Sequence, residues 1–183
     1  MPNINLIESE IAGLIEDFNQ NPDVFLTEED VRSHLVSRLL RHQEFSQLSD
    51  TSNDSMSIPL HTEVRWYGRN GALRYRSDIV LFDTASLRTK REFDLPSKGY
   101  AFDTFYAVIE LKLRRLSRRS DTKYLQMIAE DFEKLQHIIR EVEDIAGARY
   151  YLICFDKKKD INASLARFQG DQRIDFHYVF KAS

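Results

Sequence analysis

The sequence predicts one α/β domain spanning residues 1–183, in which helices flank a mixed central sheet. Some segments have apolar residues at the spacing of a helix. Between them lie short segments in which apolar and polar residues alternate, or in which nearly all residues are apolar, as in strands. A chain of 183 residues has the size of one ordinary domain. It can bury a substantial core without disulfides.

The composition argues against several classes of protein. With 42% hydrophobic and 30% charged residues, the chain is expected to be globular rather than disordered. One cysteine permits no internal disulfide or cysteine-pair zinc site, which favours a cytoplasmic location. The acidic N-terminus and the lack of an apolar run of about 18 residues disfavour secretion and membrane insertion. A net charge of -3 disfavours coating of nucleic acid by bulk charge, but it leaves room for a local basic patch.

Two helices are predicted near the N-terminus. Apolar residues at close to helical spacing predict the first helix, which ends before the Asn-Pro pair at 21–22: Ile4, Ile7, Ile11, Leu14, Ile15 and Phe18. The second helix is expected to start at Glu28, because Thr27 offers an N-cap oxygen and Asp30 stands at the capping-box position. Small and polar residues at 42–59 then predict an exposed connection.

The strands and the remaining helices follow. Alternation over 60–67, the turn residues GRNG at 68–71 and a second strand at 72–82 predict a hairpin. The run TFYAVIELKL at 104–113 predicts a strand buried on both faces for most of its length. A long amphipathic helix is expected from Tyr124 to Val142, closed by Gly147. A strand at 148–155 with a core Cys154, a weaker helix near 162–168 and a last strand at 173–180 complete the order.

Three charged residues interrupt the apolar strands. Asp78 precedes the apolar end of the second strand of the hairpin, and Glu110 and Lys112 lie inside the strand at 104–113. Residues two apart in a strand project from the same face, so Glu110 and Lys112 are expected to point together. Buried charges are very unfavourable without partners, so this trio needs an ion, a counter-charge or water.

Phosphodiester hydrolysis would use such a trio. If Asp78 comes from the neighbouring strand, its carboxylate and that of Glu110 can converge on a hard divalent cation, with the Leu111 carbonyl as a further ligand. The cation would polarise a phosphate, and Lys112 would orient the nucleophile or stabilise phosphoryl charge. A base role for Lys112 would require a depressed pKa, which partial burial and a nearby cation could produce.

Three segments carry a resemblance to a known family: TEEDVRSHLVSRLL at 27–40, SDIVLF at 77–82 and VIELKL at 108–113. In these segments the chain resembles the PD-(D/E)xK phosphodiesterase superfamily, and the element order is similar over roughly residues 25–155. One departure is Ser77, which stands where the name of the motif has proline. The resemblance implies the restriction-endonuclease-like fold.

The resemblance also implies a site. Asp78 and Glu110 would bind Mg²⁺ or Mn²⁺, and Lys112 would be the catalytic lysine. The E-x-D-V-R run at 28–32 is similar to a helix in nuclease domains of type I restriction motor subunits, so Glu28 would complete the site, with Glu29 as the alternative. The implied activity is Mg²⁺-dependent endonuclease cleavage of nucleic acid, with DNA the expected substrate, in a defence or repair role.

A basic run follows the third strand without an intervening acid: Arg114, Arg115, Arg118 and Arg119. These side chains could contact the phosphates that flank the scissile bond, which would make affinity depend on salt. The alternative is a solvated loop. Further along, Asp131 and Lys134 could reach the site from the long helix, or they could form an exposed i, i+3 pair.

Other interpretations stay open at this point. A D…E-x-K pattern is short, so a structural ion pair is the alternative to an active site. For Glu28 the alternative is an acid that the helix dipole favours in any first turn. A nuclease-fold module that binds nucleic acid or a partner protein without cutting is the second functional hypothesis. A homodimer is plausible because cleavage of both strands of a duplex needs two sites, and a targeting partner protein is a further hypothesis.

Overall fold

The structure is a computed structural model that describes residues 3–52, 54–67, 73–88, 104–117, 119–141 and 147–182. The helices are α1 (Ile4–Gln20), α2 (Glu28–Leu39), α3 (Gln43–Ser46) and α4 (Asp121–Glu141). The short 3₁₀ turns are η1 (Pro22–Val24), η2 (Thr84–Ser86), η4 (Asn162–Ser164) and η5 (Ala166–Phe168). The strands are β1 (Ser49–Asp50), β2 (Met56–Ser57), β3 (Leu60–Tyr67), β4 (Leu73–Phe82), β5 (Phe105–Arg114), β6 (Arg149–Asp156) and β7 (Ile174–Phe180).

A five-stranded mixed sheet is the centre of the fold. Its strand order is β3-β4-β5-β6-β7, and β1 pairs with β2 in a separate small sheet. The pairs β3/β4 and β4/β5 are antiparallel, whereas β5/β6 and β6/β7 are parallel. The parallel connection from β5 to β6 runs through α4, as parallel pairs require a crossover. The predicted α/β class with a mixed, helix-flanked sheet is confirmed.

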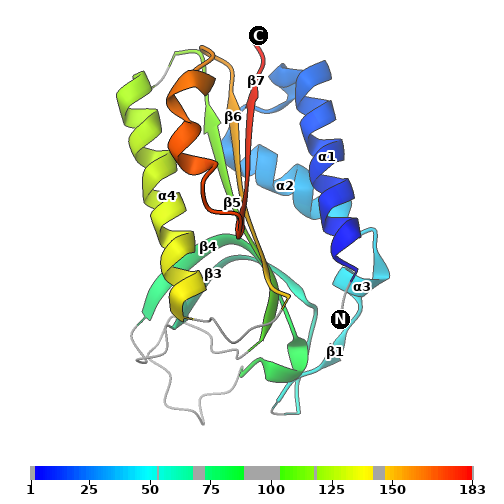
Figure 1. The fold of residues 1–183 in the computed structure, drawn as a ribbon. Coiled ribbons are helices and arrows are strands. Elements are labelled where there is room, and N and C mark those ends of the chain that lie inside the picture. The colour runs from blue at the N-terminus through cyan, green and yellow to red at the C-terminus, as the bar shows by residue number, and fades with distance from the viewer. Residues whose placement is uncertain are drawn as a thin grey trace.

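Helices cover both faces of this sheet. In Figure 1, α1 and α2 lie on one face and α4 lies on the other. Ile109, Leu111 and Leu113 of β5 belong to the core beneath α1 and α2, whereas Val108 belongs to the core beneath α4. Because successive strand residues point to opposite faces, β5 is buried on both, and its Glu110 and Lys112 share the α4 face.

The start of α2 is fixed by its own sequence. The Thr27 side chain accepts a hydrogen bond from the Asp30 backbone N–H, and the Asp30 carboxylate accepts one from the Thr27 N–H. This reciprocal capping box satisfies two backbone donors that a helix N-terminus otherwise leaves unpaired. The predicted start at Glu28 is therefore confirmed, and the first residue of the helix is placed against β5.

Helices α1 and α2 are joined by an ion-pair cluster. Arg38 of α2 contacts the carboxylates of Glu10 and Asp17 on α1, at 3.1 and 2.5 Å. A Cβ on Gly13 would lie 2.6 Å from Arg38 Nη1, so a larger residue there would shift the guanidinium from its place across α1. This contact fixes α2 relative to α1.

Two expectations were wrong. The segment at 42–59 is not a simple exposed connection, because it contains α3, with Phe45 fully buried, and the β1/β2 pair. Burial of the Phe45 ring orders this segment, although its polar composition predicted no helix or strand. Near 162–168 the chain forms only η4 and η5 rather than a helix. The hairpin turn at 68–71 and Val142 lie outside the described residues.

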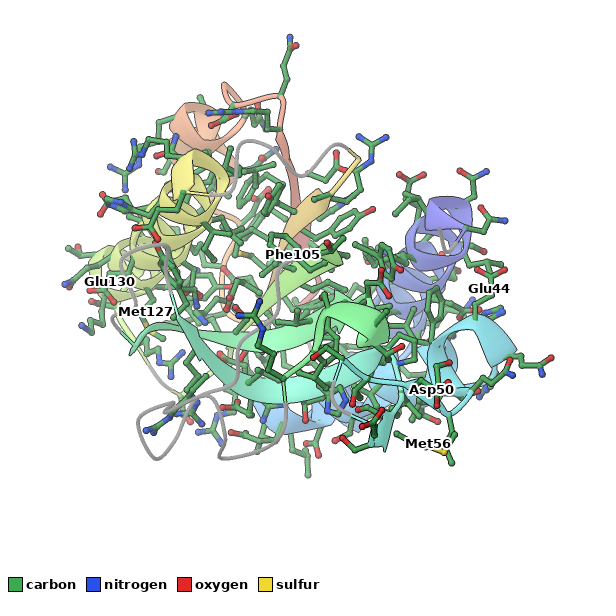
Figure 2. The ribbon with its side chains drawn as sticks, turned by 90° about the horizontal axis from the view of Figure 1, so that it is seen from below. Glu44, Asp50, Met56, Phe105, Met127 and Glu130 are labelled. Carbon is green, nitrogen blue, oxygen red and sulfur yellow. The ribbon has the colours of Figure 1, made fainter. Side chains whose placement is uncertain are left out.

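Figure 2 shows Met127 and Glu130 of α4 on the opposite side of the molecule from Glu44 of α3, with Phe105 of β5 between them. Within the described ranges, no helix is both long and apolar enough to cross a bilayer.

Candidate functional site

The candidate site lies where β4 and β5 stop pairing. The last pair of their ladder toward the site is Ile79 with Ile109, and the next residues are Asp78 and Glu110. Beyond that pair Asp78 takes the place of a paired strand: its Oδ2 accepts the Leu111 N–H at 2.8 Å. Its Oδ1 lies 3.2 Å from Arg32 Nη1 of α2. Asp78 therefore fills the gap that opens between β4 and β5 beyond the Ile79–Ile109 pair. We call this gap, with Asp78, Glu110 and Lys112 around it, the fork.

Glu28 enters the same fork from the N-terminus of α2. Its Oε2 accepts the Leu113 N–H at 3.2 Å, and its Oε1 lies 3.5 Å from Lys112 Nζ. Burial raises the pKa of Glu28, although attraction to Lys112 and the Leu113 hydrogen bond oppose the shift. The structure thus places this helix acid beside Lys112, whereas its part in any reaction stays a prediction.

Lys112 is held as a cation. Its Nζ lies 2.5 Å from Asp131 Oδ2 and donates to the Leu111 carbonyl at 3.0 Å. Burial alone would lower the pKa of Lys112, but attraction to Asp131, Glu28 and Asp78 outweighs burial and raises it. In the metal-free chain the pKa of Lys112 is therefore not depressed, and this surrounding of acids suits an ammonium that acts through its charge.

Glu110 is the most buried acid of the site. Its residue is 1% exposed, and its Oε2 lies 2.6 Å from Lys134 Nζ. Its other oxygen, Oε1, is buried and has no hydrogen-bond partner. Burial raises the pKa of Glu110; attraction to Lys134 opposes this, and repulsion from Asp131 and Asp78 adds to it. An unpartnered carboxylate oxygen in an interior is costly, so this atom is suited to a ligand or a proton.

Helix α4 supplies two further charges. Asp131 lies between the two ammonium groups, with Oδ2 toward Lys112 and Oδ1 3.1 Å from Lys134 Nζ. The i, i+3 spacing of Asp131 and Lys134 left two interpretations open, and the structure places both residues at the site rather than on an exposed face. Their side chains are 13% and 23% exposed.

Sequence reasoning missed two residues of the network. Arg32 Nη1 contacts both Asp78 and Glu63 of β3, and Glu63 also contacts Arg76 of β4. Arg32 is the last residue of the E-x-D-V-R run, so the run did contain the signal. Nothing in the sequence indicated that Glu63 belongs to the network, because a glutamate in an alternating strand is expected to face solvent. Its backbone φ of 56° is left-handed, which is uncommon outside glycine.

The donors present are compatible with a divalent cation. Asp78 and Glu110 offer carboxylate oxygens, and the intervening backbone offers the Leu111 carbonyl, which are the hard ligands that Mg²⁺ and Mn²⁺ take. The unpartnered Glu110 Oε1 is the observation that fits such an ion. Across the described ranges, no group of three or more His, Cys, Asp or Glu side chains is arranged to hold a metal. Any ion here would therefore rely on two acids, the carbonyl and solvent.

The expectation that Arg114 contacts phosphates was wrong. Arg114 is fully buried, and its guanidinium is paired with Asp156 and with Asp121 at the start of α4. It also donates to the Lys159 carbonyl at 2.9 Å and lies over the Tyr124 ring, 4.9 Å from its centroid. Because the Arg114 side chain is 0% exposed, none of its donors faces solvent. Arg114 instead joins the ends of β5 and β6 to α4.

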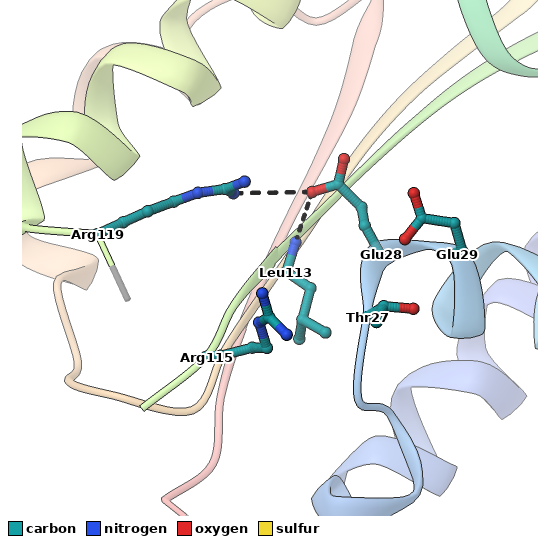
Figure 3. Close-up of a pocket in the computed structure, with 6 residues that line it drawn as sticks. All are labelled: Thr27, Glu28, Glu29, Leu113, Arg115 and Arg119. Carbon is teal, nitrogen blue, oxygen red and sulfur yellow. Dashed lines mark hydrogen bonds and ion pairs between the residues drawn. The ribbon is translucent and has the colours of Figure 1, made fainter. Parts of the chain in front are cut away.

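Two other arginines of the basic run line a pocket of about 160 Å³ together with Glu28. Figure 3 shows Arg115 and Arg119 on one side of this pocket and Glu28 and Glu29 of α2 on the other, with Leu113 between them. Arg119 Nη1 lies 3.9 Å from Glu28 Oε2, and the Arg119 side chain is 36% exposed. Arg118 lies outside the described residues. Two guanidinium groups are thus available beside the fork.

Comparisons with known proteins give one structural likeness. No protein-family model matches the chain, and no curated protein does. The solved structure of E. coli MS115-1 NucC in its cAAA-bound form is similar over 94% of this chain and 72% of that chain, with 12% sequence identity and a TM-score of 0.39. A TM-score this low supports no argument about activity.

Proposed function

We propose that the chain is a metal-dependent nuclease of the PD-(D/E)xK class that hydrolyses phosphodiester bonds of nucleic acid, with DNA as its main substrate. The observation that carries this proposal is the buried, unpartnered Oε1 of Glu110, at the point where Asp78 and Lys112 also lie. A carboxylate oxygen without a partner in an interior calls for a cation or a proton. The neighbouring acid, carbonyl and ammonium are the groups that phosphodiester hydrolysis uses.

Asp78, Glu110 and the Leu111 carbonyl would hold Mg²⁺ or Mn²⁺. Bound there, the ion would polarise the phosphate and lower the pKa of a water molecule. Leu111 contributes to the site twice, because its N–H fixes Asp78 while its carbonyl accepts from Lys112. The fork thereby holds its own ligands in place through the backbone of β5.

Lys112 would act as a fixed positive charge. Asp131 and Glu28 hold its Nζ beside the Leu111 carbonyl and keep it protonated. An ammonium held this way can stabilise charge that develops on phosphoryl oxygens without any rearrangement of its own. The raised pKa of Lys112 in the metal-free chain favours this role over that of a general base.

Arg115 and Arg119 would bind the phosphates that flank the reacting one. They line the pocket next to Glu28, whereas Arg114 is fully buried. Backbone phosphate contacts of this kind position a nucleic acid without reading its sequence.

One observation favours a second candidate, a nuclease-fold module that binds without cutting. Asp78 and Glu110 each already have a cationic partner, Arg32 and Lys134. An ion-pair network of this kind can serve a structural role without any metal. The two candidates differ in whether Mg²⁺ or Mn²⁺ binds at the fork.

The test combines cleavage with metal binding. Supercoiled DNA and single-stranded RNA are incubated with Mg²⁺ or Mn²⁺ and the wild-type chain, Asp78→Asn, Lys112→Met or Asp175→Asn, an exposed-acid control on β7. We expect cleavage by the wild type and the control, and its loss in the two site variants. Calorimetry should show Mn²⁺ binding that Asp78→Asn weakens. Equal cleavage by all four proteins would contradict the proposal, and nucleic-acid binding without Mn²⁺ binding would favour the module that does not cut.

A further inference from the structure

Lys134 occupies an unusual place among the charges of the site. Its Nζ lies 2.6 Å from Glu110 Oε2, 3.1 Å from Asp131 Oδ1 and 3.1 Å from the Arg76 carbonyl. All three partners are oxygens, and one of them belongs to the most buried acid of the fork. Hard metal ions are also bound by carboxylate and carbonyl oxygens of this kind.

The ammonium of Lys134 is carried on α4, whereas its acid Glu110 is carried on β5. A lysine side chain has a flexible four-carbon stem, so its Nζ can move while the helix stays in place. Lys134 is 23% exposed, so the ammonium has a route to solvent, whereas Glu110 at 1% has none. If Nζ left Glu110, Asp131 Oδ1 and the Arg76 carbonyl would remain as its partners.

We propose that Lys134 is a tethered counter-ion that neutralises Glu110 when no metal is bound and that a divalent cation displaces it from Glu110. This inference rests on the proposed function and adds a regulation to the same site. Glu110 would otherwise be a buried carboxylate without a cation in the metal-free protein, which is strongly destabilising.

The displacement sets a threshold for metal binding. A divalent ion has to replace an existing ion pair rather than fill an empty position, so Lys134 weakens metal affinity while it stabilises the metal-free chain. The ion that enters gains Oε1 of Glu110, which is unpartnered, as well as Oε2, which Lys134 releases. Lys112 is not part of the exchange, because Asp131 and Glu28 hold it.

The first test measures Mn²⁺ binding by calorimetry in the wild type, Lys134→Met and Lys123→Met. Lys123 is a matched control, because it lies on the same helix and contacts Gln126 on an exposed face. We expect Lys134→Met to bind Mn²⁺ about tenfold more tightly than the wild type, and Lys123→Met to bind as the wild type does. Unchanged or weaker Mn²⁺ binding by Lys134→Met would overturn the inference and leave the proposed nuclease standing.

The second test needs no variant. An amine-reactive ester is reacted with the wild-type chain with and without Mn²⁺, and the modification of each lysine is measured by mass spectrometry. We expect Mn²⁺ to increase modification of Lys134 several-fold and to leave Lys123 unchanged. A rate at Lys134 that does not respond to bound Mn²⁺ overturns the displacement. Absence of Mn²⁺ binding in both the wild type and Lys134→Met is a different failure, because it removes the proposed metal site itself.

Discussion

The backbone N–H of Leu113 donates a 3.2 Å hydrogen bond to Glu28 Oε2 and so joins two residues 85 positions apart in the chain. The bond fixes the first residue of α2 to β5, which no longer pairs with β4 at that point. A single carboxylate thereby satisfies a strand donor and contacts Lys112 with its other oxygen.

Two substitutions of Glu28 separate these contributions. Glu28→Gln keeps an oxygen that can accept from Leu113, so we expect a free energy of unfolding close to that of the wild type. Glu28→Ala leaves the Leu113 N–H without its acceptor, and we expect a loss of about 1–2 kcal/mol. Urea denaturation measures both values. Equal stabilities of the two variants would show that the hydrogen bond contributes nothing.

Replacement of Arg115 and Arg119 should change how nucleic-acid binding responds to salt. Each cation that contacts a phosphate adds about one to the slope of log affinity against log salt, so Arg115→Ala with Arg119→Ala should lower the slope by about two. Fluorescence anisotropy with labelled DNA at several salt concentrations measures the slope. The control is Arg149→Ala, an exposed arginine at the start of β6, which should leave the slope unchanged. A slope that the double variant does not alter would contradict the proposed phosphate contacts.

Arg114 should affect stability far more than a surface arginine does. Arg114→Met removes the partner of the fully buried Asp156, and breaking such a pair costs about 3–5 kcal/mol. We expect Arg149→Met to cost less than about 0.5 kcal/mol by the same denaturation measurement. The double variant Arg114→Met, Asp156→Leu should recover part of the loss, because it leaves no buried charge alone. A surface-like cost for Arg114→Met would contradict the observed burial.

Asp171 gives a prediction for the pH dependence of stability. Hydrogen bonds from the Arg173 side chain lower the pKa of Asp171 to about 2. A carboxyl whose pKa is lower in the folded than in the unfolded chain contributes stability above the unfolded value, near 4, and the contribution is lost as the pH falls toward about 2. After allowance for solvent screening, we expect Asp171→Asn to cost about 1 kcal/mol at pH 7. That cost should decrease as the pH falls toward 2 and vanish below it in thermal denaturation, and a cost independent of pH would contradict the assignment.

Much of the fold could be predicted because its signals are local. The capping box at Thr27, the alternation of β3 and the apolar run of β5 each follow from neighbouring residues. Segment 42–59 could not be predicted, because its order depends on burial of Phe45 against distant elements rather than on its own composition.

The site was predictable only in part for the same reason. Asp78, Glu110 and Lys112 stand out because a charge inside an apolar strand needs a partner. Arg114 reads as the first residue of a solvated basic run, and only the fold reveals Asp156, which lies 42 residues further along the chain. The position of Asp131 and Lys134 depends on how α4 packs on the sheet, which helical spacing alone does not fix.

The side chains of the fork come together only late in the synthesis of the chain. They come from α2, β4, β5 and α4, so no contiguous fragment shorter than residues 28–134 carries all of them. A growing polypeptide therefore cannot assemble the arrangement until its long C-terminal-half helix has been made and docked. Any chemistry at this place would therefore begin only after Lys134 has been added to the chain and α4 has packed on the sheet.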